Sequence, residues 1–239
     1  MGILEKMRLD GKKGFVTGAA RGIGKASARA LCEAGADIAI VDLDIREAEK
    51  TAGELAAETG KDVFAVACDC TDPDQVNRMV ETILERYGRL DIAHCNAGIC
   101  INAPAEEMTY EQWKKVVDCN LNGIFLTNQA AGRVMLKQGS GSIINTASMS
   151  GHIVNVPQPQ CAYNASKAGV HHLTRSLAAE WASRGVRVNA VAPTYIETEM
   201  TAYVYEDPEL MRHWIGGTPM GRMGRPDEIA AVVVFLASD

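Results

Sequence analysis

The chain alternates short, apolar, β-branched runs with longer stretches that have helical spacing. Runs of this length are typical of strands buried on both faces of a parallel sheet. They lie at Gly14–Thr17, Asp37–Val41, Asp62–Cys68, Leu90–Ala93, Ser142–Asn145 and Val186–Val191. Because crossovers between parallel strands are right-handed, the alternation predicts an α/β fold: a doubly wound parallel sheet with helices on both faces.

Helix start signals support this alternation. Asp72-Pro73 supplies an N-cap and a first-turn proline, and Thr109 followed by Gln112 forms a capping box. The Gly/Ser-rich segment 139–142 is only long enough for a turn, so no linker divides the chain.

The composition fits one large globular domain. Of 239 residues, 47% are hydrophobic and 23% are charged, which excludes disorder as the main state. Since one α/β domain can reach about 250 residues, we expect a single domain over 1–239. The net charge of -6 offers no basic surface for nucleic acid or an anionic membrane, so a small polar molecule is the expected partner.

The cellular location and the absence of a metal site are predicted from sequence signals that the chain lacks. It has no run of 18 apolar residues and no signal-peptide pattern, which predicts a cytoplasmic protein. Seven cysteines without a repeated spacing favour free, mostly buried thiols over disulfides. The adjacent His171 and His172 point to different sides of a helix, so no metal site is expected.

A glycine-rich turn follows the first predicted strand. The segment Thr17-Gly18-Ala19-Ala20-Arg21-Gly22-Ile23-Gly24 runs directly into an alanine-rich stretch. Glycines suit this place because a side chain would block both the tight turn and the approach of a pyrophosphate to the helix N-terminus. The context of strand, turn and helix therefore predicts a dinucleotide site.

Asp42 ends the second strand, 18 residues beyond Gly24. A carboxylate there can accept a hydrogen bond from the adenosine ribose 2'-hydroxyl and would repel a 2'-phosphate, which favours NAD over NADP. Arg21 argues for NADP, since its guanidinium could pair with that phosphate. Asp42 outweighs it, because an unpaired carboxylate facing a phosphate costs more than one exposed arginine recovers. The alternative is that Asp42 is an ordinary acid at a loop edge.

Two further strand ends bear polar or small residues. Asp69 either accepts a hydrogen bond from the adenine amino group or caps the helix that begins near Pro73. Asn96-Ala97-Gly98 permits close contact with a nucleotide, although it also suits any turn from strand to helix.

Candidate catalytic groups occupy the second half of the chain. Tyr163 and Lys167 are four residues apart and share one helix face. A nearby ammonium favours phenolate, so the pairing is expected to lower the tyrosine pKa toward the range of a general acid or base. Ser148 ends the fifth strand, where its hydroxyl could hold a substrate oxygen. Each residue alone has a structural alternative: a solvated helix face, a strand end or, for Asn120, a helix interruption.

Taken together, these motifs resemble the short-chain dehydrogenase/reductase family over nearly the whole chain. The resemblance implies a Rossmann-like fold, with Tyr163 as general acid or base and Ser148 positioning the reacting oxygen. It also implies that Lys167 binds the nicotinamide ribose and that Asn120 holds a water linking Lys167 to solvent. The further matches are Thr17–Gly24, Asn96–Gly98 and the run Asn189-Ala190-Val191-Ala192-Pro193. Pro193 and Ile196 would border the nicotinamide, with Thr198 near its carboxamide or the phosphates. In the family a final strand usually follows the position of Asp239, and the printed chain ends before it.

The implied reaction is hydride transfer between NAD(H) and a secondary alcohol or ketone. His152, Asn155, Gln158 and Gln160 offer hydrogen-bonding groups near the catalytic serine and tyrosine. With Ser148 and Tyr163, three of them (His152, Asn155 and Gln160) are the candidate substrate residues. The segment resembles that of mannitol dehydrogenases and sorbose reductases, so a sugar alcohol and its ketose are the expected pair. The alternative is that these side chains bond only to the protein.

Three expectations complete the reading. Residues 198–217 would form a substrate lid with Tyr203, Tyr205 and Trp214. The resemblance implies a homo-oligomer, a tetramer or a dimer. Two other functions compete: a 3-oxoacyl-[acyl-carrier-protein] reductase using NADPH, and a non-catalytic NAD-binding scaffold.

Overall fold

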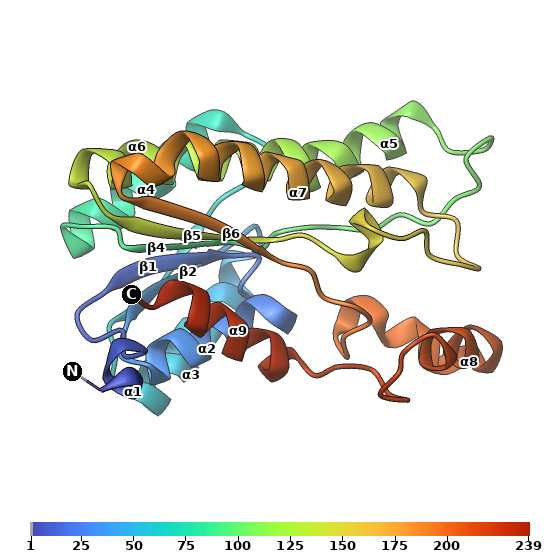
Figure 1. Ribbon diagram of the computed structural model, residues 1–239, viewed down its shortest axis with the longest axis horizontal. Coiled ribbons are helices and arrows are strands. Elements are labelled where there is room, and N and C mark those ends of the chain that lie inside the picture. The colour runs from blue at the N-terminus through green and yellow to red at the C-terminus, as the bar shows by residue number, and fades with distance from the viewer. Residues whose placement is uncertain (1) are drawn as a thin grey trace.

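A six-stranded parallel sheet forms the centre of the computed structural model, which describes residues 2–239 (Figure 1). The strands follow the order β3-β2-β1-β4-β5-β6, and every neighbouring pair is parallel. Their bounds are β1 Lys13–Thr17, β2 Asp37–Asp42, β3 Val63–Ala67, β4 Ile92–Cys95, β5 Gly141–Thr146 and β6 Val186–Val191. All six predicted strands are confirmed, with ends shifted by up to two residues.

Helices cover both faces of the sheet, as the alternation predicts. One face carries α1 (Ile3–Lys6), α2 (Gly22–Glu33), α3 (Ile45–Thr59) and α9 (Pro226–Ala237), and the other carries α4 (Pro73–Tyr87), α5 (Tyr110–Val117), α6 (Gly123–Gln138) and α7 (Cys161–Trp181) (Figure 1). The helix α8 (Pro208–Gly216) lies apart from both layers, beyond the end of the sheet (Figure 1). Both predicted caps are confirmed: the Asp72 side chain accepts from the amides of Asp74 and Gln75, and Thr109 and Gln112 form the capping box.

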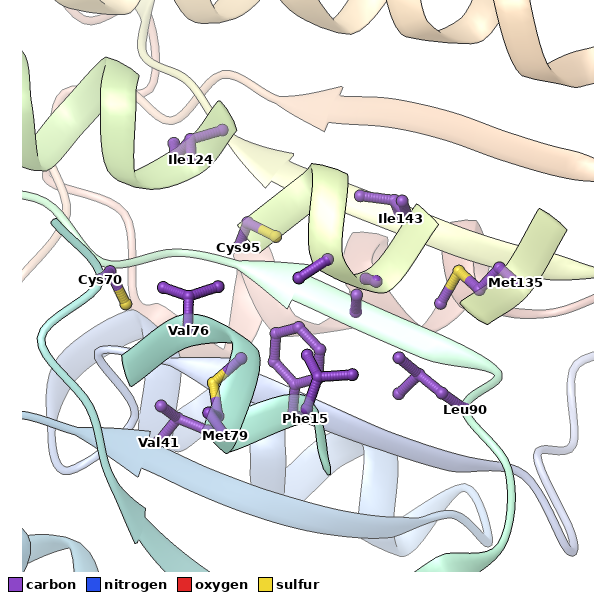
Figure 2. Packing of buried hydrophobic residues seen from close by; sticks show 14 of the residues in the cluster. Phe15, Val41, Cys70, Val76, Met79, Leu90, Cys95, Ile124, Met135 and Ile143 are labelled. Atoms are coloured by element: carbon purple, nitrogen blue, oxygen red, sulfur yellow. The ribbon is translucent and has the colours of Figure 1, made fainter. Parts of the chain in front are cut away.

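Successive residues of β1 supply the cores on opposite faces, because strand side chains alternate in direction. Phe15 is fully buried in one core, in the same cluster as Met79 of α4 and Met135 of α6 (Figure 2). Val16 belongs to the core on the other face, together with Leu31 of α2. The central strands are thus apolar on both sides, which fixes the sheet between its helical layers.

The strand order places a crevice beside β1. The chain builds outward from β1 through β2 and β3, then returns to add β4 on the other side of β1. At such a reversal the connections leave the carboxyl ends of β1 and β4 in opposite directions, which opens a crevice between them. None of the helices in residues 2–239 is long and apolar enough to cross a membrane.

Candidate active site

A continuous cleft opens at this crevice and gathers most of the predicted cofactor residues. Those that line it are Gly18, Arg21, Gly22, Ile23, Asp42, Asp69, Asn96, Ala97, Gly98, Tyr163, Lys167 and Thr198. Sequence reasoning missed nine others: Leu43, Cys68, Cys70, Thr71, Ile99, Cys119, Thr146, Glu199 and Met200. Gly24, Pro193 and Ile196 do not line the cleft, and the Ile196 side chain is buried with its Cδ1 beside Gly224.

The glycine turn leaves room for a ligand at the N-terminus of α2. Gly18 and Gly22 have φ of 61° and 56°, values that favour glycine. A Cβ on Gly24 would lie 2.1 Å from the Gly18 carbonyl oxygen, so this glycine lets the helix approach the turn. The Asn96 amide donates to the carbonyls of Thr17 (3.0 Å) and Gly18 (3.2 Å) and holds the turn from β4. The open backbone fits a bound pyrophosphate.

Asp42 has a structural role as well as a place in the cleft. Its two carboxylate oxygens accept from the amides of Ala20 (3.0 Å) and Asp44 (3.2 Å). Each oxygen keeps a second lone pair, so a ribose hydroxyl could still donate to it. The Arg21 guanidinium lies 3.8 Å from the Asp44 carboxylate. Asp42 is therefore hydrogen-bonded to the backbone around it, and the alternative of an unpaired acid at a loop edge is wrong.

The structure separates the two roles considered for Asp69. The cap of α4 is Asp72, whereas Asp69 Oδ1 accepts from the Thr71 amide (2.9 Å) and the Thr71 hydroxyl (2.7 Å). The capping alternative for Asp69 is therefore wrong. Asp69 lies in the cleft with Leu43 and Cys68, where apolar walls and a carboxylate fit an adenine ring with its amino group.

Tyr163 and Lys167 both come from α7 and meet at the inner end of the cleft. The Lys167 ammonium lies 5.6 Å from the centroid of the Tyr163 ring and donates to the Thr146 carbonyl at 2.7 Å. Burial lowers the pKa of Lys167 to about 8. Burial also raises the pKa of Tyr163 to about 12, while a hydrogen bond with Ser148 opposes this rise.

The expected lowering of the tyrosine pKa is thus wrong in direction. Burial of the phenol disfavours its charged form more strongly than its surroundings stabilise that form. Because Lys167 is buried too, its own charged form is disfavoured. Tyr163 is consequently protonated at neutral pH, the form in which a phenol acts as a general acid.

Asn120 lies in a π-helical turn, Asp118–Asn122, between α5 and α6. Its Oδ1 accepts from the Ile99 amide at 2.8 Å, and its Nδ2 donates to the Ile99 carbonyl and the Ser166 hydroxyl at 2.9 and 3.1 Å. A Cβ on Gly98 would lie 3.2 Å from Asn120 Oδ1 and 3.4 Å from the Lys167 ammonium. Gly98 therefore packs closely against both side chains, and Asn120, which ties the Ile99 backbone to Ser166, is more than a helix interruption.

Thr146 links the two halves of the site, which the sequence motifs do not reveal. Its carbonyl accepts from Lys167, and its hydroxyl donates to Asn96 Oδ1 at 3.1 Å. His94 Nε2 lies 2.9 Å from the same hydroxyl. Since that hydroxyl proton is already directed to Asn96, His94 Nε2 must be the donor. Burial lowers the pKa of His94 to about 3, so the ring stays neutral.

The predicted substrate residues differ in whether their side chains are exposed or buried. His152 is exposed, and its ring contacts the His171 ring, with centroids 3.9 Å apart. Asn155 and Gln160 are buried and bond to one another and to other protein groups. Ser148 lies beside Tyr163, as their hydrogen bond requires. For Asn155 and Gln160 the structure therefore favours the alternative, in which these side chains bond to other protein groups and not to a ligand.

The predicted lid contains the 3₁₀ segment η4 (Glu199–Glu206) and α8. Its core is a small separate cluster of Val204, Leu210, Trp214 and Met223. Among residues 2–239, no three His, Cys, Asp or Glu side chains converge as metal ligands.

Comparison with known proteins gives a family for this arrangement. A family model described as enoyl-(acyl carrier protein) reductase matches residues 18–239. A galactitol 2-dehydrogenase from Rhizobium johnstonii is 46% identical, covering 100% of this chain and 92% of the relative. A sorbose reductase from Candida albicans is 42% identical, covering 99% and 84%. The crystal structure of a short-chain type dehydrogenase/reductase from Mycobacterium marinum has a TM-score of 0.95 and 42% identity, covering 99% and 92%.

The chain belongs to the short-chain dehydrogenase/reductase family. It is an NAD(P)-dependent oxidoreductase that acts on alcohols and ketones. Both the doubly wound fold and the cleft agree with that class.

Proposed function

We propose that the protein interconverts a sugar alcohol and its ketose with NAD(H). The observation that carries the proposal is the polar character of the space beyond Tyr163. There the Cys100 thiol lies 3.4 Å from Asn102 Oδ1 and 4.0 Å from Gln160 Oε1, and Asn102 Nδ2 lies 3.5 Å from the Tyr203 hydroxyl. The 3.5 Å contact between Asn102 and Tyr203 is long and therefore weak, so these two groups can exchange it for bonds to substrate hydroxyls.

Different side chains of the protein would carry out different parts of the reaction. The nicotinamide supplies or accepts the hydride when it is bound. Tyr163 gives a proton to the carbonyl oxygen during reduction and takes it back during oxidation. Ser148 would hold that oxygen. Lys167 would hold the ribose, with its ammonium directed by the hydrogen bond to the Thr146 carbonyl. Asn120 would hold the water that connects Lys167 to solvent.

We place NAD ahead of NADP because of Asp42. A 2'-phosphate in the ribose position would face this carboxylate, whereas a free hydroxyl could donate to it. The Asp44 carboxylate, 3.8 Å from the Arg21 guanidinium, further offsets the charge of that arginine. The names of the galactitol and sorbose relatives support the sugar-alcohol class but do not decide the cofactor.

A substrate panel tests the proposal. We expect NAD-linked oxidation of galactitol, mannitol or sorbitol, and reduction of sorbose with NADH. A parallel assay follows reduction of an acetoacetyl thioester with NADPH, the reaction of the 3-oxoacyl alternative, which a 41% identical relative is named for. Activity confined to the thioester and NADPH would replace our proposal with that alternative. Tight NAD binding without any turnover would instead support the scaffold.

The assembly and the location stay predictions. Tyr110 and Trp113 on α5 and Phe125 on α6 expose apolar surface, which supports a homo-oligomer. Light scattering of the purified protein distinguishes a monomer from a dimer or tetramer. Imaging of a tagged protein tests the cytoplasmic location.

A further inference from the structure

The loop 152–160 and the lid share a buried contact that the sequence does not predict. The Tyr195 ring, which precedes the lid, stacks on Trp214 of α8, with centroids 3.9 Å apart and planes within 5°. The Tyr195 hydroxyl lies 3.0 Å from Asn155 Nδ2 and 3.4 Å from Gln158 Nε2. Trp214 Nε1 donates to Gln158 Oε1 at 3.2 Å. Because Asn155, Gln158 and Trp214 are all buried, these bonds form away from solvent competition.

The same loop reaches the catalytic serine through further side chains. Gln160 Nε2 donates to Asn155 Oδ1 at 3.1 Å and lies 3.4 Å from the Ser150 hydroxyl. The Ser148 hydroxyl donates to the Ser150 hydroxyl at 3.0 Å, and the Ser150 amide donates back to Ser148 Oγ at 3.1 Å. A continuous series of hydrogen bonds therefore joins Tyr195 to Ser148.

We propose that Tyr195 is a positioning residue whose hydroxyl fastens the loop 152–160 to the lid and, through that loop, sets the orientation of Ser148. When the lid is docked, the Tyr195 hydroxyl fixes the Asn155 amide, and Asn155 Oδ1 then directs one hydrogen of the Gln160 amide. Gln160 Nε2 also lies 2.9 Å from Asn164 Oδ1, so its two hydrogens serve three acceptors. Loss of the bond between Gln160 and Asn155 would redistribute the remaining bonds of the Gln160 amide. The Ser150 hydroxyl, and with it the hydrogen bond between Ser150 and Ser148, would then change direction.

Three tyrosines close to one another in sequence allow a matched test. The Tyr195 hydroxyl bonds to the loop, the Tyr203 hydroxyl lies near Asn102 at the proposed substrate space, and the Tyr205 hydroxyl bonds only to Glu197 at 3.1 Å. Replacing each by phenylalanine removes one hydroxyl and keeps the ring. The substrates are threitol, with four carbons, and galactitol, with six; this choice rests on the proposed function.

Tyr195→Phe should lower kcat/KM roughly tenfold, as loss of one or two buried hydrogen bonds implies. The factor should be the same for both polyols, and kcat should fall, because the change acts on Ser148 rather than on distal hydroxyls. Tyr203→Phe should instead reduce activity on galactitol more than on threitol. Tyr205→Phe removes a lid hydroxyl that does not reach the loop, so it should not reproduce the equal loss of kcat on both polyols. A Tyr195→Phe enzyme with native kcat, or with losses that differ between the two polyols, would overturn the proposal.

Hydrogen-deuterium exchange supplies a readout that needs no substrate. Tyr195→Phe should accelerate amide exchange in 149–160 as well as in 208–216, whereas Tyr205→Phe should not affect 149–160. Asn155→Ala combined with Tyr195→Phe should have an effect smaller than the sum of the two single changes, because both remove the bond between Tyr195 and Asn155, although each also removes one further contact. Faster exchange confined to 208–216 would reject the link to Ser148. If the wild-type enzyme turned over no polyol, the proposed function would fail while the exchange data still decided the role of Tyr195.

Discussion

The nucleotide side and the substrate side of the cleft are built by different means. On the nucleotide side the backbone carries the site: Gly18, Gly22 and Gly24 bring main chain close to a ligand, and Asp42 and Asn96 hold that main chain in place. On the substrate side, side chains bond to side chains from distant segments, as Trp214 does to Gln158, 56 residues earlier. A backbone site demands particular residues in a short segment, whereas a side-chain network can be built from many combinations.

Tyr163→Phe should have the largest effect, because both sides of the cleft converge on this phenol. Without its proton donor, kcat should fall by at least about 100-fold, while the ring still fills its place. Steady-state rates measure the loss, and fluorescence titration with NADH should show unchanged cofactor binding. Near-native turnover would remove Tyr163 from the proton-transfer step.

Gly24→Ala tests whether the backbone really carries the nucleotide side. A Cβ there would meet the Gly18 carbonyl at 2.1 Å, so the turn must shift away from its ligand-binding shape. We expect NADH affinity to fall by more than about tenfold, the equivalent of 1.4 kcal/mol. The control is Gly53→Ala on α3, where a Cβ meets no atom within 4 Å and should stabilise the helix by roughly 1 kcal/mol. Equal NADH binding in the two variants would contradict the geometric argument.

The same division explains how much could be predicted from the sequence. The six strands, the caps at Asp72 and Thr109, and the glycine turn follow from local patterns, since each depends on residues close together in the chain. The pairing of Tyr163 with Lys167 also follows from a local pattern, but the pKa of Tyr163 does not. The direction of the tyrosine pKa depends on how the whole fold buries the phenol, and spacing along one helix cannot report that.

Long-range contacts of the side chains were out of reach for the same reason. Thr146 and His94 read as ordinary strand residues, yet the fold makes Thr146 the link between Asn96 and Lys167. Asn155 and Gln160 were recognised as polar groups near the site, although their partners lie in the loop itself and at Tyr195. The sequence shows that Asn155 and Gln160 are polar and close to the catalytic residues, and only the three-dimensional structure shows which groups they bind.

The pH dependence should distinguish the two directions of the reaction. Burial raises the pKa of Tyr163 to about 12, so below that value the phenolate fraction grows with pH. Oxidation needs the phenolate as base, and kcat/KM for the alcohol should therefore rise with pH, by up to about tenfold per unit. Reduction needs the phenol and should not rise. Profiles in both directions check this prediction.

Ser148→Ala sharpens the pH test. The hydrogen bond with Ser148 opposes the rise of the Tyr163 pKa, so its removal should lower the phenolate fraction and the oxidation rate at every pH below about 12. The slope of the oxidation profile should stay the same, because the Tyr163 pKa lies above the measured range in both enzymes. A slope that changes in the variant, or a rate that falls with pH in the wild type, would show that another group controls the proton step.

Asp42→Asn should have the smallest effect, on the choice between the two cofactors. The amide keeps an acceptor for the ribose hydroxyl and removes the charge that would face a 2'-phosphate. We expect the ratio of kcat/KM for NAD to that for NADP to fall about tenfold, the scale of one charge-assisted hydrogen bond. Asp69→Asn is the matched control, since that carboxylate lies in the cleft but bonds to Thr71 instead of the glycine turn. If both variants changed the ratio equally, general charge in the cleft would set the preference, and Asp42 would matter only as the residue that holds the Ala20 amide.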